Sequence, residues 1–423
     1  MGGAFDGVTV VEFGQFVVVP FCAQLMADCG ARVIKVEPPS GDSYRSGGGQ
    51  LADGFTRQFL IKNRGKESIA LDLAHPEARQ VVEGLVRQAD VVLINVSPNA
   101  IARRGLDYET LRQVNPRIIY ATVSAFGHVG PEADLPGMDV VVQARSGLMT
   151  TLGAERDGVP LHSEAQVADY ATSLLLFGGV AAALYARATT GVGQKVETSL
   201  MAGALAIQNN SLGHVHGQDT WREEFVSTVL PRMRAERADR DEILAYREAH
   251  RADPMNHVKH YRAFRTSDGF VALGAGSPAS RRRLAEVLGL DDSLVETDPD
   301  QFGRAVEVQM AQEPSEHWIN TFRSAGVPVS GVYNVDELFF DDHALSEGLI
   351  ADYHHEQAGA YRAFGRPIRM SETPMTAGPP APGFGAHTAS ILHELGFTDD
   401  QIDSLVATTA VVDGRSRTIG GKP

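Results

Sequence analysis

Asp169 is the side chain whose type and position most directly suggest chemistry. It lies just before residues 171–186, an Ala- and Leu-rich segment without proline that is long enough for about four turns of helix. An aspartate here can cap the helix, because its oxygens accept hydrogen bonds from the unpaired N–H groups of the first turn. A helix N-terminus also favours the ionised carboxylate, which can attack an activated carbonyl carbon. The spacing leaves both interpretations open, a helix cap and a catalytic nucleophile.

The part of the chain before residue 124 predicts the fold that has to position this carboxylate. Short apolar runs alternate with helical patterns, which is typical of a Rossmann-like parallel sheet with helices on both faces, an α/β fold. The predicted strands are 8–13, 31–36, 68–73, 91–95 and 118–124, and the predicted helices are 21–29, 76–88 and 108–113.

The predicted ligand pocket lies at one edge of that sheet. Ligands of open α/β sheets bind outside the carboxyl ends of the strands, so the loops after residues 13, 36, 95 and 124 are expected to surround it. The first loop reads Gly14-Gln-Phe-Val-Val-Val-Pro20 and lacks the Gly-x-Gly-x-x-Gly fingerprint that holds a dinucleotide. A nicotinamide enzyme is therefore disfavoured.

A set of motifs in a fixed order runs along most of the chain. They are Val10-Val-Glu-Phe13, residues 20–39, Asn63-Arg-Gly-Lys-Glu-Ser-Ile-Ala-Leu-Asp72, Ser124-Ala-Phe-Gly127, Pro136-Gly-Met-Asp139, Thr190-Gly-Val-Gly-Gln194, Ala325-Gly-Val-Pro-Val329 and Pro382-Gly-Phe-Gly-Ala-His-Thr388. Together they resemble the family III CoA-transferases, of the CaiB/BaiF type that includes formyl-CoA transferase-like proteins. The resemblance spans nearly the whole chain apart from about 205–255.

The resemblance implies a division into domains. A large CoA-binding domain is expected over 1–205, a helical linker over 206–255, a small α+β domain over 256–329, and a return to the large domain over 330–423. Residues 261–276 are expected to form hairpin strands and a glycine turn. Family members form an interlocked homodimer, and we expect the same of this chain from the resemblance alone.

The resemblance also assigns a role to Asp169, which stands where the family has its nucleophile. Asp169 would carry CoA as an aspartyl thioester while CoA moves from an acyl-CoA to a small carboxylic acid. The CoA thioester is then a substrate, and no permanently bound cofactor is expected.

Two alternatives remain. The first is an α-methylacyl-CoA racemase on the same fold, but racemases pair the aspartate with a histidine where this chain has Met138, and a thioether cannot carry a proton. The second is a non-catalytic CoA-binding subunit of a heteromeric transferase, against which the presence of Asp169 argues.

Further residues are expected around the CoA substrate. Val17 and Met138 are predicted to form its walls, and Gly274 and Gly276 match a glycine-rich loop that covers the active site in some members. Cations near the loops are candidates for the CoA phosphates, although for any one of them a solvated surface charge is the commoner role. These cations are Arg64, Lys66 and Arg104, with Lys62 and Arg103 close by in the sequence.

Composition sets the remaining bounds. Hydrophobic residues make up 43% and charged residues 22%, as in an ordinary globular enzyme, and the net charge of −15 disfavours nucleic acid and anionic membranes as partners. Two cysteines imply no disulfide framework, and no targeting pattern is recognised at the start, so we expect a cytoplasmic protein. The apolar run 170–186 is expected to be a buried helix, and the histidine pairs at 214/216 and 354/355 lack the partners of a metal site.

Overall fold

The chain divides into two compact units. The computed structural model describes residues 1–423 except 1, 48, 53, 209–211, 251–258 and 415–423. The larger unit consists of Met1–Gly213 and Asp342–Pro423, and the smaller unit is His214–Asp341. Two boundaries differ from the prediction: most of the segment 206–255 groups with the smaller unit, and the chain returns to the larger unit at 342 and not at 330.

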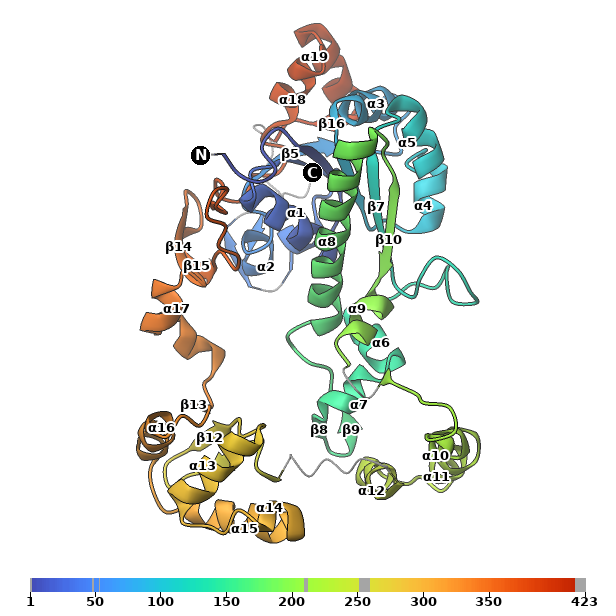
Figure 1. Cartoon of the computed structure of the whole chain (residues 1–423). Coiled ribbons are helices and arrows are strands. Elements are labelled where there is room, and N and C mark those ends of the chain that lie inside the picture. The colour runs from blue at the N-terminus through green and yellow to red at the C-terminus, as the bar shows by residue number, and fades with distance from the viewer. Residues whose placement is uncertain (1, 48, 53, 209–211, 251–258, 415–423) are drawn as a thin grey trace. The chain divides into compact units, whose positions relative to one another are not determined.

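A seven-stranded sheet forms the centre of the larger unit (Figure 1). The strand order is β10-β7-β6-β1-β2-β5-β16, and all neighbours are parallel except β16, which runs antiparallel to β5. The strands are β1 (Thr9–Phe13), β2 (Arg32–Glu37), β5 (Lys66–Leu71), β6 (Val91–Ile94), β7 (Ile119–Ser124), β10 (Lys195–Ser199) and β16 (Val411–Val412). The predicted parallel α/β sheet is confirmed, and β10 and β16 extend it at its two edges.

Helices cover both faces of this sheet, and each face has its own apolar core. One core joins the sheet to α3 (Ala78–Gln88), α5 (Tyr108–Val114), α18 (Thr388–Glu394) and α19 (Asp399–Ala407). The other joins it to α1 (Val18–Asp28), α6 (Asp139–Arg145), α7 (Leu148–Leu152), α8 (Val167–Thr190) and α9 (Leu200–Ala206). Side chains of the central strands are buried on both faces and are mostly apolar, which makes these runs recognisable in the sequence. The charged exceptions, Glu12, Lys35, Glu37 and Lys66, are paired with other buried charges.

Shorter elements complete the larger unit. They are η1 (Ser43–Arg45), β3 (Gln50–Ala52), β4 (Phe55–Thr56), α2 (Arg57–Leu60), α4 (Pro98–Arg103), β8 (Glu155–Arg156), β9 (Val159–Pro160), α17 (Asp342–Ser346), β14 (Ile350–His355) and β15 (Gly359–Phe364).

Helix α8 is the longest in the larger unit and buries only one side. Leu176, Val180 and Ala183 are buried against the sheet, and Ser173 Oγ donates to the carbonyl of Val18 at 2.9 Å, which joins α8 to the start of α1. Leu174, Leu175 and Tyr185 are exposed on the other side. By length and hydropathy alone α8 would suffice to span a bilayer, a criterion that helices in the cores of soluble proteins also meet.

The smaller unit is an α+β structure, as predicted. Its antiparallel sheet has the order β11-β12-β13, and β11 and β12 form the expected hairpin. Its elements are α10 (Thr220–Glu224), η3 (Phe225–Val229), α11 (Leu230–Ala235), α12 (Arg240–His250), β11 (Ala263–Arg265), β12 (Phe270–Leu273), α13 (Pro278–Leu288), α14 (Leu294–Thr297), α15 (Pro299–Met310), α16 (Ser315–Ser324), β13 (Val329–Gly331) and η5 (Val335–Phe340).

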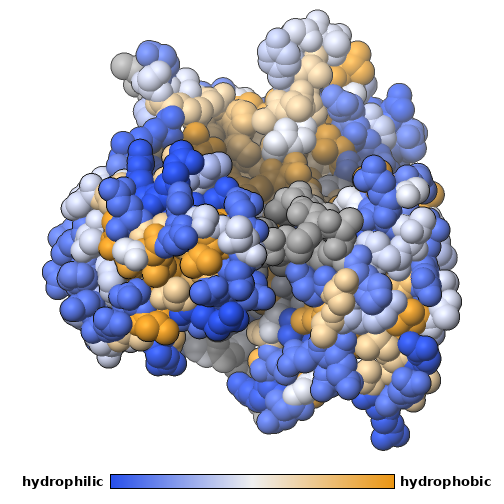
Figure 2. Space-filling view, turned by 60° about the horizontal axis from the view of Figure 1, so that its bottom comes forward, coloured by the Kyte–Doolittle hydropathy of each residue, from blue (hydrophilic) through white to orange (hydrophobic). Residues whose placement is uncertain are grey.

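Figure 2 shows mostly hydrophilic residues on the projecting parts of this face, and hydrophobic residues in smaller groups and in a broader area in the upper middle of the view. Such a surface is ordinary for a protein in water.

Buried ion pairs hold the loop between β2 and β5 against the sheet. Lys35 Nζ lies 2.8 Å from Glu12 Oε1 and 2.7 Å from Asp42 Oδ2. Arg45 binds both oxygens of Glu37, at 2.6 and 2.8 Å, and its guanidinium lies 3.8 Å from the ring centroid of Phe59. All these charged side chains are almost fully buried. These contacts fix the path of the loop from Asp42 to Arg45.

We predict that Glu37→Ala lowers the free energy of unfolding by about 3–5 kcal/mol, because it leaves the buried Arg45 guanidinium without its carboxylate. Glu83→Ala, which breaks the solvent-facing Arg79–Glu83 pair, is the matched control and should cost less than about 1 kcal/mol. Urea unfolding of both variants measures the difference. Equal losses would show that the Glu37–Arg45 pair does not hold the loop.

Candidate active site

A cavity of about 160 Å³ lies at the carboxyl ends of β1, β6 and β7. It opens where the strand order reverses, because β1 has β2 on one side and β6 on the other. The loops after residues 13, 95 and 124 contribute to its lining, as predicted, and the loop after 36 does not. The lining residues are Phe16, Val17, Val18, Asn95, Val123, Ser124, Ala125, Gly137, Met138, Asp139, Asp169 and Leu200.

Asp169 lines this cavity from the first turn of α8. The helix begins at Val167, earlier than predicted, so Asp169 is a residue of the first turn and does not occupy the capping position. The side chain is 7% exposed. Among the described residues, no hydrogen-bond donor to its carboxylate oxygens is found, so these oxygens are available to a molecule in the cavity.

The capping role belongs to Asp139, which lies 30 residues earlier in the chain. Asp139 Oδ1 accepts hydrogen bonds from the backbone N–H groups of Ala168 at 2.9 Å and of Asp169 at 3.1 Å. The cap interpretation of Asp169 is therefore wrong, because a carboxylate from another helix already satisfies these donors.

Gln143 holds the carboxylate of Asp139 in place. Its side-chain nitrogen donates to Asp139 Oδ2, and its side-chain oxygen accepts from the N–H of Ser163 at 2.8 Å. Asp139 and Gln143 are buried and lie one turn apart on α6. This chain of hydrogen bonds fixes α6, the 163–166 loop and the start of α8 relative to each other.

Electrostatics at Asp169 oppose its ionisation. Burial raises its pKa from the ordinary value of 3.8 to about 7, and the neighbouring negative charge of Asp139 adds to the rise. The positive charge of Lys62 acts in the opposite direction. A carboxyl pKa raised by burial and by a neighbouring negative charge is a common property of catalytic carboxylates.

Lys62 is a buried cation beside Asp169. It follows α2, its ammonium donates to Gln58 Oε1, and it lies 5.3 Å from the ring centroid of Tyr44 and 6.0 Å from that of Tyr170. Burial lowers the pKa of Lys62 to about 8, and the charges of Asp169 and Asp42 oppose this fall. The sequence placed Lys62 among candidates for the CoA phosphates, and no spacing in the sequence connects it with Asp169.

Two residues with left-handed backbone flank the cavity region. Phe16 has φ 67° and Gln166 has φ 51°, values that cost free energy for residues other than glycine. Tyr44 contacts both: its ring packs edge-on against Phe16 with centroids 5.5 Å apart, and its hydroxyl accepts from Gln166 Nε2 at 3.3 Å. Such strain is typical of functional sites.

Val17 and Met138 line the cavity, at the positions predicted for its walls. Val17 is fully buried at the start of α1, and Met138 is half exposed immediately before α6. Asp139 and Asp169 are the ionisable side chains of the described lining, and Asp139 is engaged in capping α8. The lining therefore lacks the second free base that a racemase needs opposite Asp169.

Arg64 and Lys66 lie away from this cavity. Arg64 forms an ion pair with Asp28 at 2.5 Å and donates to the carbonyls of Phe364 and Gly365. Lys66 Nζ lies 2.7 Å from Glu12 Oε2 and donates to Pro20 O and Asn63 Oδ1. The prediction that both hold CoA phosphates disagrees with these positions, because each charge is buried and already paired within the fold.

The other predicted binding residues are dispersed. Arg104 is exposed at the end of α4 and does not line the cavity. Gly274 and Gly276 belong to the smaller unit, where Gly274 N donates to the carbonyl of Pro328 at 2.9 Å. The roles of these residues toward CoA stay predictions.

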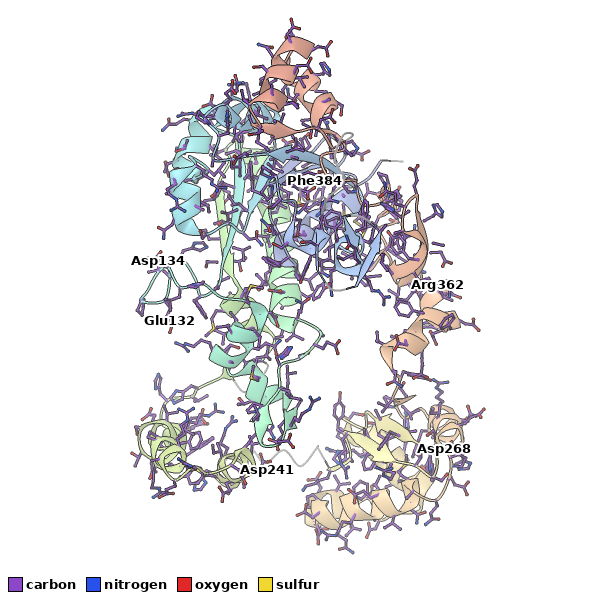
Figure 3. All side chains as sticks on the ribbon, turned by 180° about the vertical axis from the view of Figure 1, so that it is seen from behind. Glu132, Asp134, Asp241, Asp268, Arg362 and Phe384 are labelled. Carbon is purple, nitrogen blue, oxygen red and sulfur yellow. The ribbon has the colours of Figure 1, made fainter. Side chains whose placement is uncertain are left out.

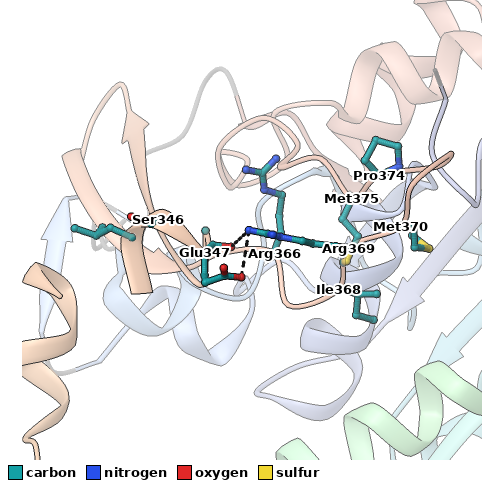
Figure 4. A pocket seen from close by; sticks show the side chains of 10 residues that line it. Ser346, Glu347, Arg366, Ile368, Arg369, Met370, Pro374 and Met375 are labelled. Carbon is teal, nitrogen blue, oxygen red and sulfur yellow. Dashed lines mark hydrogen bonds and ion pairs between the residues drawn. The ribbon is translucent and has the colours of Figure 1, made fainter. Parts of the chain in front are cut away.

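A second cavity, of about 390 Å³, lies in the C-terminal part of the larger unit (Figure 4). Arg369 crosses it and binds the side chain of Glu347 at 3.2 Å and its backbone carbonyl at 3.3 Å. Its lining has no arrangement comparable to Asp139 and Asp169. In the described part of the chain, no cluster of three His, Cys, Asp or Glu side chains is suited to a metal ion.

Comparison with known proteins gives the family. The family model of "CoA-transferase family III" matches residues 5–388. The chain belongs to CoA-transferase family III. It is 32% identical to the succinate–glutarate CoA-transferase of Agrobacterium fabrum, over 92% of this chain and 95% of that protein. It is 32% identical to the acetyl-CoA:oxalate CoA-transferase of Acetobacter aceti, over 87% and 90%.

A solved structure supports the same assignment. A CaiB/BaiF family protein from Brucella suis is 26% identical, with a TM-score of 0.73 over 93% of this chain and 100% of that chain. The protein is thus a CoA-transferase with a parallel-sheet α/β fold, as the resemblance of its motifs predicted.

We predict that Asp139→Ala destabilises this CoA-transferase by about 1–3 kcal/mol, because it leaves the N–H groups of Ala168 and Asp169 without an acceptor in a buried site. Asp134→Ala serves as a control, since Asp134 is exposed on the loop that leads to α6 (Figure 3). Chemical unfolding compares the two variants. An Asp139→Ala protein as stable as the control would contradict the capping role.

The raised pKa of Asp169 predicts a pH-dependent gain in stability for Asp169→Asn. The folded-state pKa of about 7 exceeds the ordinary value of 3.8, so stability is lost as the pH rises through about 7. The advantage of Asn over Asp should therefore grow between about pH 4 and pH 7 and stay constant above. Thermal unfolding across this range measures it, and an advantage that shrinks with pH would contradict the raised pKa.

Proposed function

We propose that the protein moves CoA from an acyl-CoA thioester to a small carboxylic acid through an aspartyl-CoA thioester on Asp169. One observation carries this proposal. Asp169 presents a carboxylate without hydrogen-bond donors, among the described residues, to a cavity at the carboxyl end of the sheet, while Asp139 fixes the backbone beneath it. A carboxylate held in this way is suited to attack a carbonyl carbon.

The proposed reaction begins when an Asp169 oxygen attacks the thioester carbonyl. The C–S bond breaks, CoA leaves as a thiolate, and a mixed anhydride of Asp169 and the acyl group remains. The thiolate then attacks the Asp169 carbonyl of the anhydride, which forms the aspartyl-CoA thioester and releases the first acid. The acceptor carboxylate repeats the two steps in reverse order and leaves as a new CoA ester.

The tetrahedral intermediates of these steps carry negative charge and need hydrogen-bond donors. Val18 and Val19 carry the first N–H groups of α1, which an α-helix leaves without acceptors inside the helix. Val17 and Val18 line the cavity. We assign these N–H groups to the developing oxyanion, and the sequence of steps needs neither a metal ion nor a redox cofactor.

The relatives indicate the class of acid. Their names include succinate, glutarate and oxalate, all small dicarboxylic acids. We propose a small carboxylic acid as acceptor for this enzyme as well, and an interlocked homodimer as the working form. The exposed apolar side chains of α8, Leu174, Leu175 and Tyr185, support a partner that covers them.

Mass spectrometry of the protein after incubation with a panel of acyl-CoA esters tests the nucleophile. We expect a CoA-sized adduct on the peptide that contains Asp169, its loss with hydroxylamine, and a fall in transfer activity of at least about 1,000-fold in Asp169→Ala. Asp134→Ala is the control for a carboxylate removed from the surface and should keep the adduct.

Other outcomes of the same experiment contradict the proposal in distinct ways. An adduct that persists in Asp169→Ala would place the nucleophile elsewhere. Exchange of the α-proton into deuterated water without any adduct would indicate a racemase. The absence of both signals would indicate a missing partner subunit or a substrate outside the panel.

A further inference from the structure

Lys62 differs from the other buried lysines of the larger unit. Lys35 and Lys66 each have a carboxylate oxygen within 2.8 Å of Nζ. Lys62 is equally buried, at 1% exposure, but its ammonium donates to the neutral side chain of Gln58. Among the described residues, no carboxylate oxygen lies within ion-pair distance of Lys62 Nζ. A buried ammonium without a paired anion lowers the stability of the fold. A lysine retained in such a place is therefore a candidate for a functional role.

The groups around Lys62 show which negative charge balances it. The rings of Tyr44 and Tyr170 lie against it, and the two carboxylates that act on it electrostatically are Asp169 and Asp42. Asp42 is already paired with Lys35 at 2.7 Å. The charges that act on Asp169 are the positive one of Lys62 and the negative one of Asp139, and Asp139 is committed to the cap of α8. In the resting enzyme the negative charge of Asp169, beyond ion-pair distance, is thus the one left to balance Lys62.

We infer that Lys62 binds the carboxylate of the acceptor acid, and that it becomes available for this role when Asp169 is esterified. The inference rests on the proposed function, because it concerns the aspartyl-CoA intermediate. Asp169 loses its negative charge in the anhydride and in the thioester, so Lys62 is then left without its balancing charge. A carboxylate that enters the site restores the balance, whereas a neutral molecule does not.

The step that follows is balanced without any further reactant. The acceptor carboxylate, held by Lys62, attacks the aspartyl thioester carbonyl, the C–S bond breaks, and CoA leaves as a thiolate. The thiolate then attacks the acceptor carbonyl of the anhydride, and Asp169 leaves as a carboxylate. Its charge returns next to Lys62, which releases the uncharged end of the new thioester. No proton is gained or lost.

The two halves of the reaction can be separated experimentally. The aspartyl-CoA form is prepared with the acyl-CoA that gives the strongest adduct, and small molecules are removed by rapid gel filtration. The adduct is then discharged either by the corresponding acid, succinate if the donor was succinyl-CoA, or by hydroxylamine, a neutral nucleophile. Mass spectrometry follows the loss of the adduct with time.

We expect Lys62→Met to slow discharge by the carboxylate roughly 10- to 100-fold, the range for loss of one hydrogen bond to a charged group, and to leave discharge by hydroxylamine within about twofold. Lys62→Arg, which keeps the positive charge, should recover part of the carboxylate rate. Lys195→Met removes an exposed lysine that is paired with Glu197 and should change neither rate.

The possible outcomes lead to different conclusions. Equal slowing with both nucleophiles would show that Lys62 only supports the fold of the site, and unchanged rates with both would show that the acid binds elsewhere; either result overturns the inference and leaves the proposed function intact. If wild-type protein forms no adduct with any donor, the proposed function itself fails, and the inference with it. The unfolding midpoint of Lys62→Met shows whether this variant folds. If it does not fold, Gln58→Leu replaces it, because this substitution removes the hydrogen-bond partner of Lys62. Gln58→Leu should also slow discharge by the carboxylate and leave discharge by hydroxylamine unchanged.

Discussion

The contact between Asp139 and the first turn of α8 is the interaction on which the site depends. One carboxylate oxygen accepts hydrogen bonds from two N–H groups, those of Ala168 and Asp169, and thereby fixes the backbone of Asp169 itself. The same carboxylate places a negative charge next to Asp169 and opposes its ionisation. Asp139 therefore affects both the position and the pKa of Asp169, and a displacement of Asp139 would change both.

The surrounding charges form a layered arrangement. Deep in the larger unit, Glu12, Glu37, Lys35 and Arg45 are paired in a network that fixes the loop after β2. That loop carries Tyr44, which contacts the strained residues Phe16 and Gln166. Lys62 is buried next to the rings of Tyr44 and Tyr170, and the charge of Asp169, which changes during the proposed reaction, acts on it. The fully paired, buried network keeps the loop after β2 rigid. Lys62, which has no paired carboxylate among the described residues, is the cation whose surroundings depend on the charge of Asp169.

The α8 helix connects the site with the surface of the larger unit. Its first turn holds Asp169, its buried side packs on the sheet, and its other side exposes Leu174, Leu175 and Tyr185. An apolar stripe along one side of a helix is enough to hold the helix on the sheet.

Much of the fold could be predicted because its signals are local. The central strands of the parallel sheet are buried on both faces, so their sequences are mostly apolar, and the helix predicted at 108–113 follows a capping residue, Asp107. The position of Asp169 near the start of a long apolar helix could also be predicted, and the ordered motifs indicated the family. What the local pattern misjudged was the start of α8, because the N–H groups of its first turn are satisfied from another helix.

The surroundings of Asp169 were decided by tertiary structure alone. Lys62, Tyr44, Asp139 and Asp169 come from separate parts of the chain, and no spacing connects residues that meet only after the sheet has formed. The sequence could not separate Lys62 from Arg64 and Lys66, since all three are cations in one short stretch. Folding separates them: Arg64 and Lys66 receive buried carboxylate partners, and Lys62 receives a neutral one. The sequence determined which chemistry is available, and the packing determined which charges remain uncompensated, because compensation depends on distance and burial in space.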